Sequence, residues 1–482
     1  MSAIITSKFR LENASSFIKS VADESVYLMV GKSDPWSNNK DVTTDSAAPT
    51  PLDVQVEQND VWQNAIALKK LGAGDVSNVA PRYTWTYSTV YPAWDDADED
   101  TFAGDQFYVI NSNYDVFKCL KTPRLSSGSL VESTIEPTTT NTFHAFLTTD
   151  GYVWKYMFSV SSSDSAKFLT NSYIPVKTVV TANGDDEITK LQYQNDCAAN
   201  TTGKIYRYVV DDGGDGYTMT PPTVNVFGNG TGAQATAVIN GGKVTEVYVT
   251  GEDEYEDDFA TYNTNCGTGY SSAYVTLTGG SGSGAVVRAV LSPKNGHGSD
   301  PVRELGAFYV ESRIILSGPE GSGDFIVGNA FRQIALIKNP LDYGTVDEFG
   351  NGDISTDSTL SALKSLTVVA GHTAFLAGDY ITGGTSAAVA FVDEYTLQND
   401  GTGLIKYHQN DKTGYAAFND TANPTNGEAI AGDVQGTGSI AATSIDDPEV
   451  EPFTGEVMFI ESRAPINRSA SQIEDVRIIV EF

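Results

Sequence analysis

Nine segments of this chain have the residue content of β-strands, and they determine which class of fold the chain can adopt. Each is rich in β-branched and aromatic residues and is bounded by Gly, Pro, Asn or Asp. They are SVYLMVGK (25–32), DQFYVINS (105–112), DVFKCL (115–120), YVWKYMFSV (152–160), KIYRYVV (204–210), AFYVESRIILSG (307–318), FRQIALIKNP (331–340), EVMFIESRAP (456–465) and DVRIIVEF (475–482). Long polar loops separate them, without the regular strand and helix alternation of a doubly wound sheet. The sequence therefore predicts a mainly β fold with a few short helices, built as a multi-domain β-sandwich body with Gly-rich β insertions.

Two segments near the N-terminus have the apolar spacing of amphipathic helices. The first repeats at i, i+3, i+4 and i+7, with Asn13 in the N-cap position. Its apolar residues are Ala14, Phe17, Ile18 and Val21. The second begins after Asn59-Asp60 and ends where Gly72 would supply a left-handed C-cap. Its inward residues are Trp62, Ala65, Ile66 and Leu68.

The middle of the chain contains an internal repeat. GDGYTMTPPTVNVFGNGTGAQATAVI (214–239) and GTGYSSAYVTLTGGSGSGAVVRAVL (267–291) share a GxGY opening, an alternating strand, a Gly-rich turn and a strand of small residues. Because glycine reaches the positive φ angles of tight turns, the pattern predicts two hairpin units packed as a quasi-repeat. A weaker repeat relates GDYITGGTSAAVA (378–390) to GDVQGTGSIAATS (432–444).

These two repeat-containing sections are interpreted as insertions into a main body whose sequence is discontinuous. A chain of 482 residues is long enough for several cooperative units. Residues 1–196 are predicted to form the first part of the main β body, with the two short helices, and residues 197–298 the Gly-rich β-repeat insertion. Residues 299–354 then return to the body, residues 355–445 form a second β insertion, and residues 446–482 supply the C-terminal strands of the body.

The net charge of the chain argues against two classes of partner. It is −32, from 62 Asp and Glu against 30 Lys and Arg, so its field repels phosphate backbones and anionic lipid headgroups. No segment approaches the roughly 20 apolar residues that span a bilayer. The N-terminal MSAIITSKFRLENASS lacks the apolar core and cleavage site of a signal peptide. We therefore expect a protein made in a cytoplasm, with neither nucleic acid nor a membrane among its partners.

The side chains that most often carry catalysis or bind zinc are few and scattered. Cys119, Cys197 and Cys266 have no CxxC spacing and no nearby His, which predicts reduced thiols without a disulfide framework or a zinc site. The histidines show neither HExxH nor HxH spacing, and no GxSxG elbow accompanies them. They are His144, His297, His372 and His408. The glycines on both sides of His297 predict a tight turn that joins the insertion to the body.

Two acidic loops offer oxygen ligands for calcium, but neither fits a known template. In DDADEDTFAGD (95–105), Thr101 stands where an EF-hand loop needs glycine, and the final Glu is missing. A solvated acidic loop is the favoured interpretation there, and an Asp/Gly turn is favoured for DDGGDG (211–216). The Gly-rich GNGTG and GGSGSG lack the Lys-Ser/Thr of a phosphate-binding loop and are interpreted as hairpin turns. From these motifs we expect no catalytic residue, no metal and no cofactor.

The segment GYVWKYMFSV (151–160) places four large rings at every second position. In a strand, Tyr152, Trp154, Tyr156 and Phe158 would all project from one face. Such a face can be a carbohydrate platform, part of an enzyme cleft, or a surface that packs on another sheet or subunit. Packing is the favoured interpretation, since each ring removed from water contributes about 2 kcal/mol. Lys155 and Met157 on the other face are expected at a partly covered boundary.

Several motifs, taken in order, resemble the family of baseplate wedge subunits known as gene product eight in T-even-like contractile-tailed bacteriophages. They are ITSKFR (5–10), VGKSDPWS (30–37), VAPR (79–82) with the later YP (91–92), TIEP (134–137), DGYVWKYMF (150–158), FRQIALIKNPL (331–341) and GEVMFIESRAPI (455–466). The resemblance covers the N-terminal part to about Tyr173, the segment 331–341 and the part from about Gly455. It does not extend to the sections near 203–296 and 355–444.

The resemblance implies a non-enzymatic structural protein of the virion. It implies a homodimer that joins other baseplate wedge proteins, with assembly in the host cytoplasm and a final place in the tail baseplate. The family supplies no catalytic residue or cofactor to transfer to this chain.

The aromatic residues are the candidates for interface contacts or for packing within the chain. Besides the four rings of segment 151–160, they are Trp36, Trp85, Tyr91 and Trp94. Packing in the core is at least as well supported for each of them. An alternative function is a carbohydrate- or receptor-binding tail module on the Gly-rich repeats, with Tyr217 and Tyr270 as the rings to test. Hydrolysis of cell-wall polymers would require a positioned carboxylate pair, which sequence does not reveal.

Overall fold

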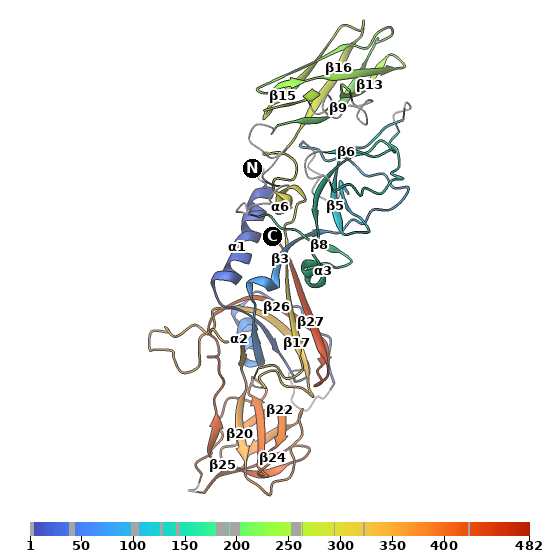
Figure 1. Ribbon diagram of the computed structural model, residues 1–482. Coiled ribbons are helices and arrows are strands. Elements are labelled where there is room, and N and C mark those ends of the chain that lie inside the picture. Colours follow the sequence, from blue (N-terminus) through green and yellow to red (C-terminus); the bar gives the residue numbers. More distant parts are fainter. Residues whose placement is uncertain are drawn as a thin grey trace. The chain divides into compact units, whose positions relative to one another are not determined.

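The fold divides into two compact units (Figure 1). The computed structural model describes residues 4–37, 44–97, 106–125, 129–140, 145–179, 192, 203–251, 262, 264–293, 295–321, 323–422 and 425–482. The first unit consists of Met1–Ser15, Ser77–Glu311 and Ile479–Phe482, and the second of Ser16–Val76 and Ser312–Ile478.

Strands dominate the described residues, which confirms the mainly β prediction. All nine segments named above form strands: β1 (Val26–Gly31), β4 (Tyr108–Ile110), β5 (Asp115–Lys121), β7 (Val153–Ser159), β9 (Ile205–Asp215), β17 (Tyr309–Ser317), β18 (Ala330–Lys338), β26 (Glu456–Asn467) and β27 (Ile473–Glu481). The segment DDGGDG, expected as a turn, is instead the end of β9, which pairs with β16 (Ser283–Leu291) as far as Asp215. The arrangement of the sheets as sandwiches, and the five-part division of the chain, stay predictions.

The two helices expected near the N-terminus are present with different bounds. Helix α1 covers Ser7–Asp23, so Asn13 lies inside it and is not its N-cap. Helix α2 covers Gln55–Gln63, and the residues expected to continue it form β2 (Ala65–Lys70). Pairing of β2 with β1 outweighs the helical spacing of its apolar residues. Gly72 has a φ of −91° at the start of a 3₁₀ turn, so the predicted left-handed cap is wrong.

Other elements among the described residues include two short helices and a four-stranded sheet. The helices are α3 (Ser162–Phe168) and α6 (Pro301–Glu304). The sheet has the order β27-β17-β3-β8, with β3 at Val76–Pro81 and β8 at Tyr173–Pro175.

A five-stranded sheet with the order β19-β2-β1-β18-β26 forms one part of the second unit. Its edge strand β19 covers Thr359–Ser361, and its central strand β1 is buried along its whole length. The antiparallel ladder between β1 and β18 runs from Val26 opposite Lys338 to Gly31 opposite Gln333. Val61 and Trp62 of α2 join Tyr27, Met29 and Leu68 of the sheet in one hydrophobic cluster, so α2 covers one face of this sheet.

The second unit also contains a closed barrel, whose labelled strands are orange to red in Figure 1. The strand order is β20-β23-β22-β21-β24-β25. The strands are β20 (Lys364–Val368), β21 (Tyr380–Gly383), β22 (Val389–Leu397), β23 (Gly403–His408), β24 (Asn426–Gly432) and β25 (Thr437–Asp446). Its interior is filled by aliphatic and aromatic side chains, among them Leu366, Ile381, Ile405 and Ile440. Closure leaves this sheet without free edges.

One buried carboxylate, Glu428 on β24, organises a wall of this barrel. It accepts hydrogen bonds from the backbone N–H groups of Thr385, Ser386 and Asn419 at 2.7 to 2.8 Å, and from the hydroxyls of Thr385 and Ser386. Burial works to raise the pKa of Glu428, but these donors outweigh it and hold the pKa at about 2.

We expect Glu428→Gln to lower the free energy of unfolding by about 2 kcal/mol, because a glutamine amide turns an N–H group toward these donors. The depressed pKa predicts that the wild-type advantage is present above the ordinary value of 4.5 and is lost as the pH falls toward 2. Urea unfolding of both proteins at pH 7 and pH 3 checks this. Glu57→Gln is the matched control, and an equal loss at the two pH values would contradict the assignment.

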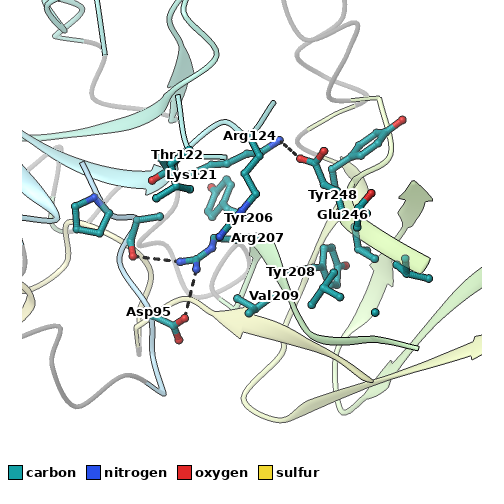
Figure 2. Close-up of a pocket in the computed structure, with 18 of the residues that line it drawn as sticks. Asp95, Lys121, Thr122, Arg124, Tyr206, Arg207, Tyr208, Val209, Glu246 and Tyr248 are labelled. Carbon is teal, nitrogen blue, oxygen red and sulfur yellow. Dashed lines mark hydrogen bonds and ion pairs between the residues drawn. The ribbon is translucent and has the colours of Figure 1, made fainter. Parts of the chain in front are cut away.

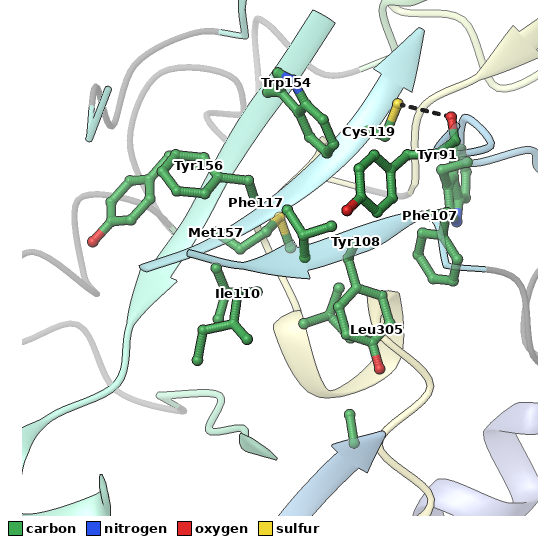
Figure 3. Close-up of a cluster of buried hydrophobic side chains, with 14 of the residues drawn as sticks. Tyr91, Phe107, Tyr108, Ile110, Phe117, Cys119, Trp154, Tyr156, Met157 and Leu305 are labelled. Carbon is green, nitrogen blue, oxygen red and sulfur yellow. Dashed lines mark hydrogen bonds between the residues drawn. The ribbon is translucent and has the colours of Figure 1, made fainter. Parts of the chain in front are cut away.

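The aromatic strand β7 lies inside a four-stranded sheet of the first unit, with the order β4-β5-β7-β6. Strand β6 covers Phe146–Leu147. Figure 3 shows Tyr91, Phe107, Tyr108, Trp154, Tyr156 and Met157 gathered in the core that this sheet helps to form. Lys155 and Met157, expected at a partly covered boundary, are also fully buried, so both faces of β7 are covered.

The Gly-rich repeats form a separate set of strands in the first unit. The larger sheet has the order β13-β12-β10-β15, and β11 pairs with β14 while β16 pairs with β9. The strands are β10 (Thr223–Gly228), β11 (Thr231–Ala233), β12 (Ala235–Asn240), β13 (Lys243–Val249), β14 (Cys266–Thr268) and β15 (Ala273–Thr278). The longest ladder between the two repeats joins β10 to β15, from Thr223 opposite Thr278 to Gly228 opposite Ala273. The predicted hairpin is present in the first repeat, where β10 pairs antiparallel with β12. It is wrong for the second repeat, since β15 pairs with β10 and β16 pairs with β9.

The tyrosine ring of each repeat packs against the Gly-rich turn of the other repeat. A Cβ atom on Gly282, in the turn of the second repeat, would lie 2.4 Å from the ring of Tyr217 of the first repeat. A Cβ atom on Gly230, in the turn of the first repeat, would lie 2.4 Å from the ring of Tyr270 of the second. Each Gly-rich turn thus leaves room for a ring from the other repeat. Both tyrosines are 4% exposed, so neither is placed to stack on a sugar as the carbohydrate alternative supposes.

Candidate interaction surfaces

The aromatic candidates are all covered to some degree within the chain. Trp85 is half-buried, and its indole N–H donates to the Ser133 hydroxyl at 3.1 Å. Seven others are buried: Trp36, Tyr91, Trp94, Tyr152, Trp154, Tyr156 and Phe158. The rings of Tyr152 and Trp154 are stacked with centroids 5.5 Å apart, and Tyr91 meets Trp154 edge to face at 5.8 Å. Hydrogen bonds fix these rings as well, because the Tyr152 hydroxyl donates to the Val131 carbonyl at 2.6 Å.

Trp94 adjoins a buried ion pair in the first unit. The Lys118 ammonium lies 2.8 Å from a carboxylate oxygen of Glu304 and 3.0 Å from Nδ1 of His297. It also lies 4.1 Å from the centre of the Trp94 ring, where a cation is attracted to the π face. Glu304 accepts from the backbone N–H groups of Gly298 and Asp300 at 2.8 to 3.2 Å. The turn around His297 and helix α6 therefore bring a histidine and a carboxylate to one buried lysine.

A second group of buried charges connects VGKSDPWS to the barrel within the second unit. Asp34 is wholly buried, with Lys32 at 2.8 Å and Lys412 also in contact. His408 lies 3.9 Å from Asp34, and its Nδ1 is 2.7 Å from Asp393. Burial works to raise the pKa of Asp34, but Lys32, His408 and Lys412 outweigh it and hold the pKa at about 2. Burial works to lower the pKa of His408, but Asp393 and Asp34 together outweigh it, so that the pKa is raised.

The thiols and the acidic motifs offer no reactive or metal-binding arrangement among the residues that the structure describes. Cys119 and Cys266 are free and buried, and burial raises the pKa of Cys119 to about 12. No group of three or more His, Cys, Asp or Glu in the described ranges is placed to hold a metal ion. Cys197, His144 and most of the 95–105 and 251–258 loops lie outside the described residues. No described helix combines the length and the hydropathy needed to cross a membrane.

A pocket of about 440 Å³ lies in the first unit, between β9 and β13 on one side and residues 92–95, 121–124 and 130 on the other (Figure 2). Its lining includes three tyrosine rings, four basic and two acidic side chains. These are Tyr206, Tyr208, Tyr248, Lys121, Arg124, Arg207, Lys243, Asp95 and Glu246. Arg207 donates to the carbonyls of Ala93 and Trp94 at 3.2 and 3.0 Å, and its guanidinium lies 3.5 Å from Asp95. The pocket is therefore preformed, and its charged lining has an excess of positive groups.

An exposed acidic loop, residues 342–353, is a second surface that the sequence pattern did not single out. Every residue from Tyr343 to Asn351 is exposed, and the Phe349 ring is 80% exposed. The loop is held by its own hydrogen bonds, since one Asp347 carboxylate oxygen accepts from the N–H groups of Phe349 and Asn351 at 2.8 and 2.9 Å. The sequence DYGTVDEFGNGD could have predicted this loop, because it combines four acidic residues and turn-forming glycines with two aromatic residues.

Comparison with known proteins supports the resemblance found in the motifs. Residues 3–125 match the model of a protein family described as Bacteriophage T4, Gp8. The baseplate wedge protein gp8 of Enterobacteria phage T4 is 27% identical to this chain over 219 residues. The match covers 36% of this chain, and the chain spans 60% of the length of that curated relative. The predicted resemblance to the family of baseplate wedge subunits is therefore confirmed.

Proposed function

We propose that this chain is a structural subunit of a contractile phage tail baseplate wedge, where it forms a homodimer and binds other wedge proteins. The similarity to a baseplate wedge protein carries the proposal. Its place would be the tail baseplate of the virion, after assembly in the host cytoplasm. The work of such a subunit is to bind neighbours through large surfaces of fixed geometry.

The chemistry of the buried charges supports a structural role. The Lys118 ammonium and the Asp34 carboxylate are both buried and both engaged by partners of opposite charge. Catalytic acids and bases need access to a substrate, whereas these groups are enclosed and tie distant segments together. The aromatic rings of β7 likewise stabilise the core of the first unit.

Sedimentation equilibrium of the purified chain, alone and mixed with the other wedge proteins of the same phage, tests the proposal. We expect a dimer by itself and a larger complex only when those proteins are added. A chain that remains monomeric at every concentration and enters no complex would remove the proposed function.

Substitution of Trp36 distinguishes a role in core packing from a role in an interface. Its indole N–H donates to the Arg463 carbonyl at 2.9 Å within the second unit, and the side chain is buried. We expect Trp36→Phe to lower the free energy of unfolding by about 1.5 kcal/mol, because the carbonyl loses its donor. The dimer dissociation constant should be unchanged, as measured by the same sedimentation experiment. Weaker association with unaltered melting would instead assign Trp36 to an interface.

The carbohydrate- or receptor-binding alternative gains no support from the rings that motivated it. Tyr217 and Tyr270 are each covered by a glycine turn of the other repeat. A glycan panel tested with the full chain remains the measurement that would revive this alternative.

A further inference from the structure

The acidic loop of residues 342–353 has features of a docking element. Aromatic residues, Phe among them, are enriched at protein interfaces, and Tyr343, Val346 and Phe349 are all exposed on this loop. Phe349 belongs to a loop whose backbone is held by internal hydrogen bonds. The backbone N–H of Asp347 donates to the Asn351 carbonyl at 2.7 Å, and the backbone N–H of Asp342 donates to the Asp353 carbonyl at 2.9 Å. A further bond anchors the base, from Gly344 N–H to the Glu451 carboxylate at 3.0 Å. Such preorganisation lowers the entropy lost on binding.

The loop has a single sign of charge. It contains Asp342, Asp347, Glu348 and Asp353, and the sequence has no Lys or Arg between Lys338 and Lys364. Its hydrogen bonds to Asn351 lower the pKa of Asp347, which keeps that carboxylate ionised. The surface that receives this loop must therefore offer an aromatic or apolar recess with positive charge around it.

The pocket of the first unit has this chemistry. The whole chain has 30 Lys and Arg against 62 Asp and Glu. The pocket lining has the opposite balance, with four basic and two acidic side chains. Tyr206, Tyr208 and Tyr248 supply aromatic lining, and the Lys121 ammonium lies 5.9 Å from the centre of the Tyr248 ring. A volume of about 440 Å³ is within the range of sites that enclose small ligands, and it exceeds what one phenylalanine side chain needs.

We propose that the pocket lined by Lys121, Arg124, Arg207 and Lys243 receives the acidic loop 342–353 of a second copy of this chain, with Phe349 as its anchor. The inference rests on the proposed self-association and names the surface that produces it. Phe349 contributes apolar burial against the tyrosines, while Glu348 and its acidic neighbours face the cations at the mouth of the pocket. An anionic loop is a fitting occupant because basic side chains outnumber acidic ones in the pocket lining.

A photocrosslinker in place of Phe349 gives the most direct test. With p-benzoylphenylalanine at position 349 in the full chain, irradiation should yield a crosslinked dimer. Its crosslinked peptides should come from residues 121–125, 206–210 or 243–248. The same crosslinker at Leu397, which is 64% exposed on β22, should give no such product.

Sedimentation equilibrium of three variants supplies the quantitative test. Phe349→Ala should raise the dimer dissociation constant at least about 30-fold, as expected for a hot-spot aromatic. Glu348→Lys and Arg124→Glu should each weaken the dimer about fivefold, and the two combined in one chain should recover most of the loss. Asp53→Lys, at an exposed carboxylate outside the loop, is the control. Unchanged melting of each variant excludes misfolding as the cause.

The outcomes separate this inference from the proposed function. A stable dimer that is insensitive to Phe349→Ala and gives no crosslink to the pocket would overturn the inference and leave self-association intact. When the other wedge proteins are added before irradiation, a crosslink only to one of them would also overturn the inference and would identify a different occupant. A chain that never dimerises would remove the proposed homodimer itself.

Discussion

Replacing Asp34 by alanine is expected to lower the free energy of unfolding by about 4 kcal/mol, because the change leaves buried cations without their shared anion. Lys32 and Lys412 both contact Asp34, and His408 lies 3.9 Å away. Asp34→Asn should cost nearly as much, since it keeps the shape and removes only the charge. Asp23→Ala, at an exposed carboxylate of α1, should change stability by less than about 0.5 kcal/mol.

The pH dependence of the same variants tests the electrostatic cause. The pKa of Asp34 is held at about 2, below its ordinary 3.8, so its contribution is present above pH 3.8 and is lost as the pH falls toward 2. The raised pKa of His408 has the opposite sign: its contribution is present below 6.5 and is lost as the pH rises through the raised pKa. The difference between wild type and Asp34→Ala should therefore be largest between about pH 4 and 6.5.

Urea unfolding followed by tryptophan fluorescence measures this difference, since Trp36 and Trp62 lie in the same unit as Asp34. A loss below about 1 kcal/mol would show that the cations find other partners or that water reaches them. A loss that does not shrink near pH 2 would show that its cause is lost packing and not the lost charge of Asp34.

The strands were predictable because their signal is local. Strands β7 and β18 are rich in β-branched, aromatic and aliphatic side chains. This composition favours a buried β-strand whichever segment of the chain supplies the partner strand. Strand β2 was mistaken for a helix because AIALKK satisfies helical spacing and has good helix formers. Only its pairing with β1 and β19, which are far apart in the sequence, decides between the two.

The buried charges were not predictable, because their meaning depends on contacts across long stretches of chain. Lys32 and Asp34 were visible only as part of a family motif, and nothing in VGKSDPWS indicates that His408 and Lys412 complete the group. The packing of Tyr217 and Tyr270 against the turns of the opposite repeats was unpredictable for the same reason. The repeat itself was recognisable, but the turn that covers each ring is set by tertiary pairing.

A second large effect is expected at the buried pair of Lys118 and Glu304. Glu304→Met should lower the free energy of unfolding by about 4 kcal/mol, because the Lys118 ammonium is wholly buried and loses its carboxylate. Lys118→Met should cost less, about 3 kcal/mol. The reason for the asymmetry is that Glu304 keeps the donors of Gly298 and Asp300 when the lysine is gone.

The double variant distinguishes a paired charge from two independent packing contributions. With both charges removed, the remaining loss should be about 2 kcal/mol, since only the backbone N–H groups of Gly298 and Asp300 then lack their acceptor. Each single loss would exceed the double loss, which is the signature of a strong coupling between the two side chains. Urea unfolding of the four proteins, followed by the fluorescence of Trp94 beside the pair, provides the cycle. Additive losses would mean that Lys118 and Glu304 act separately and that His297 and the Trp94 ring suffice to hold the ammonium in the core.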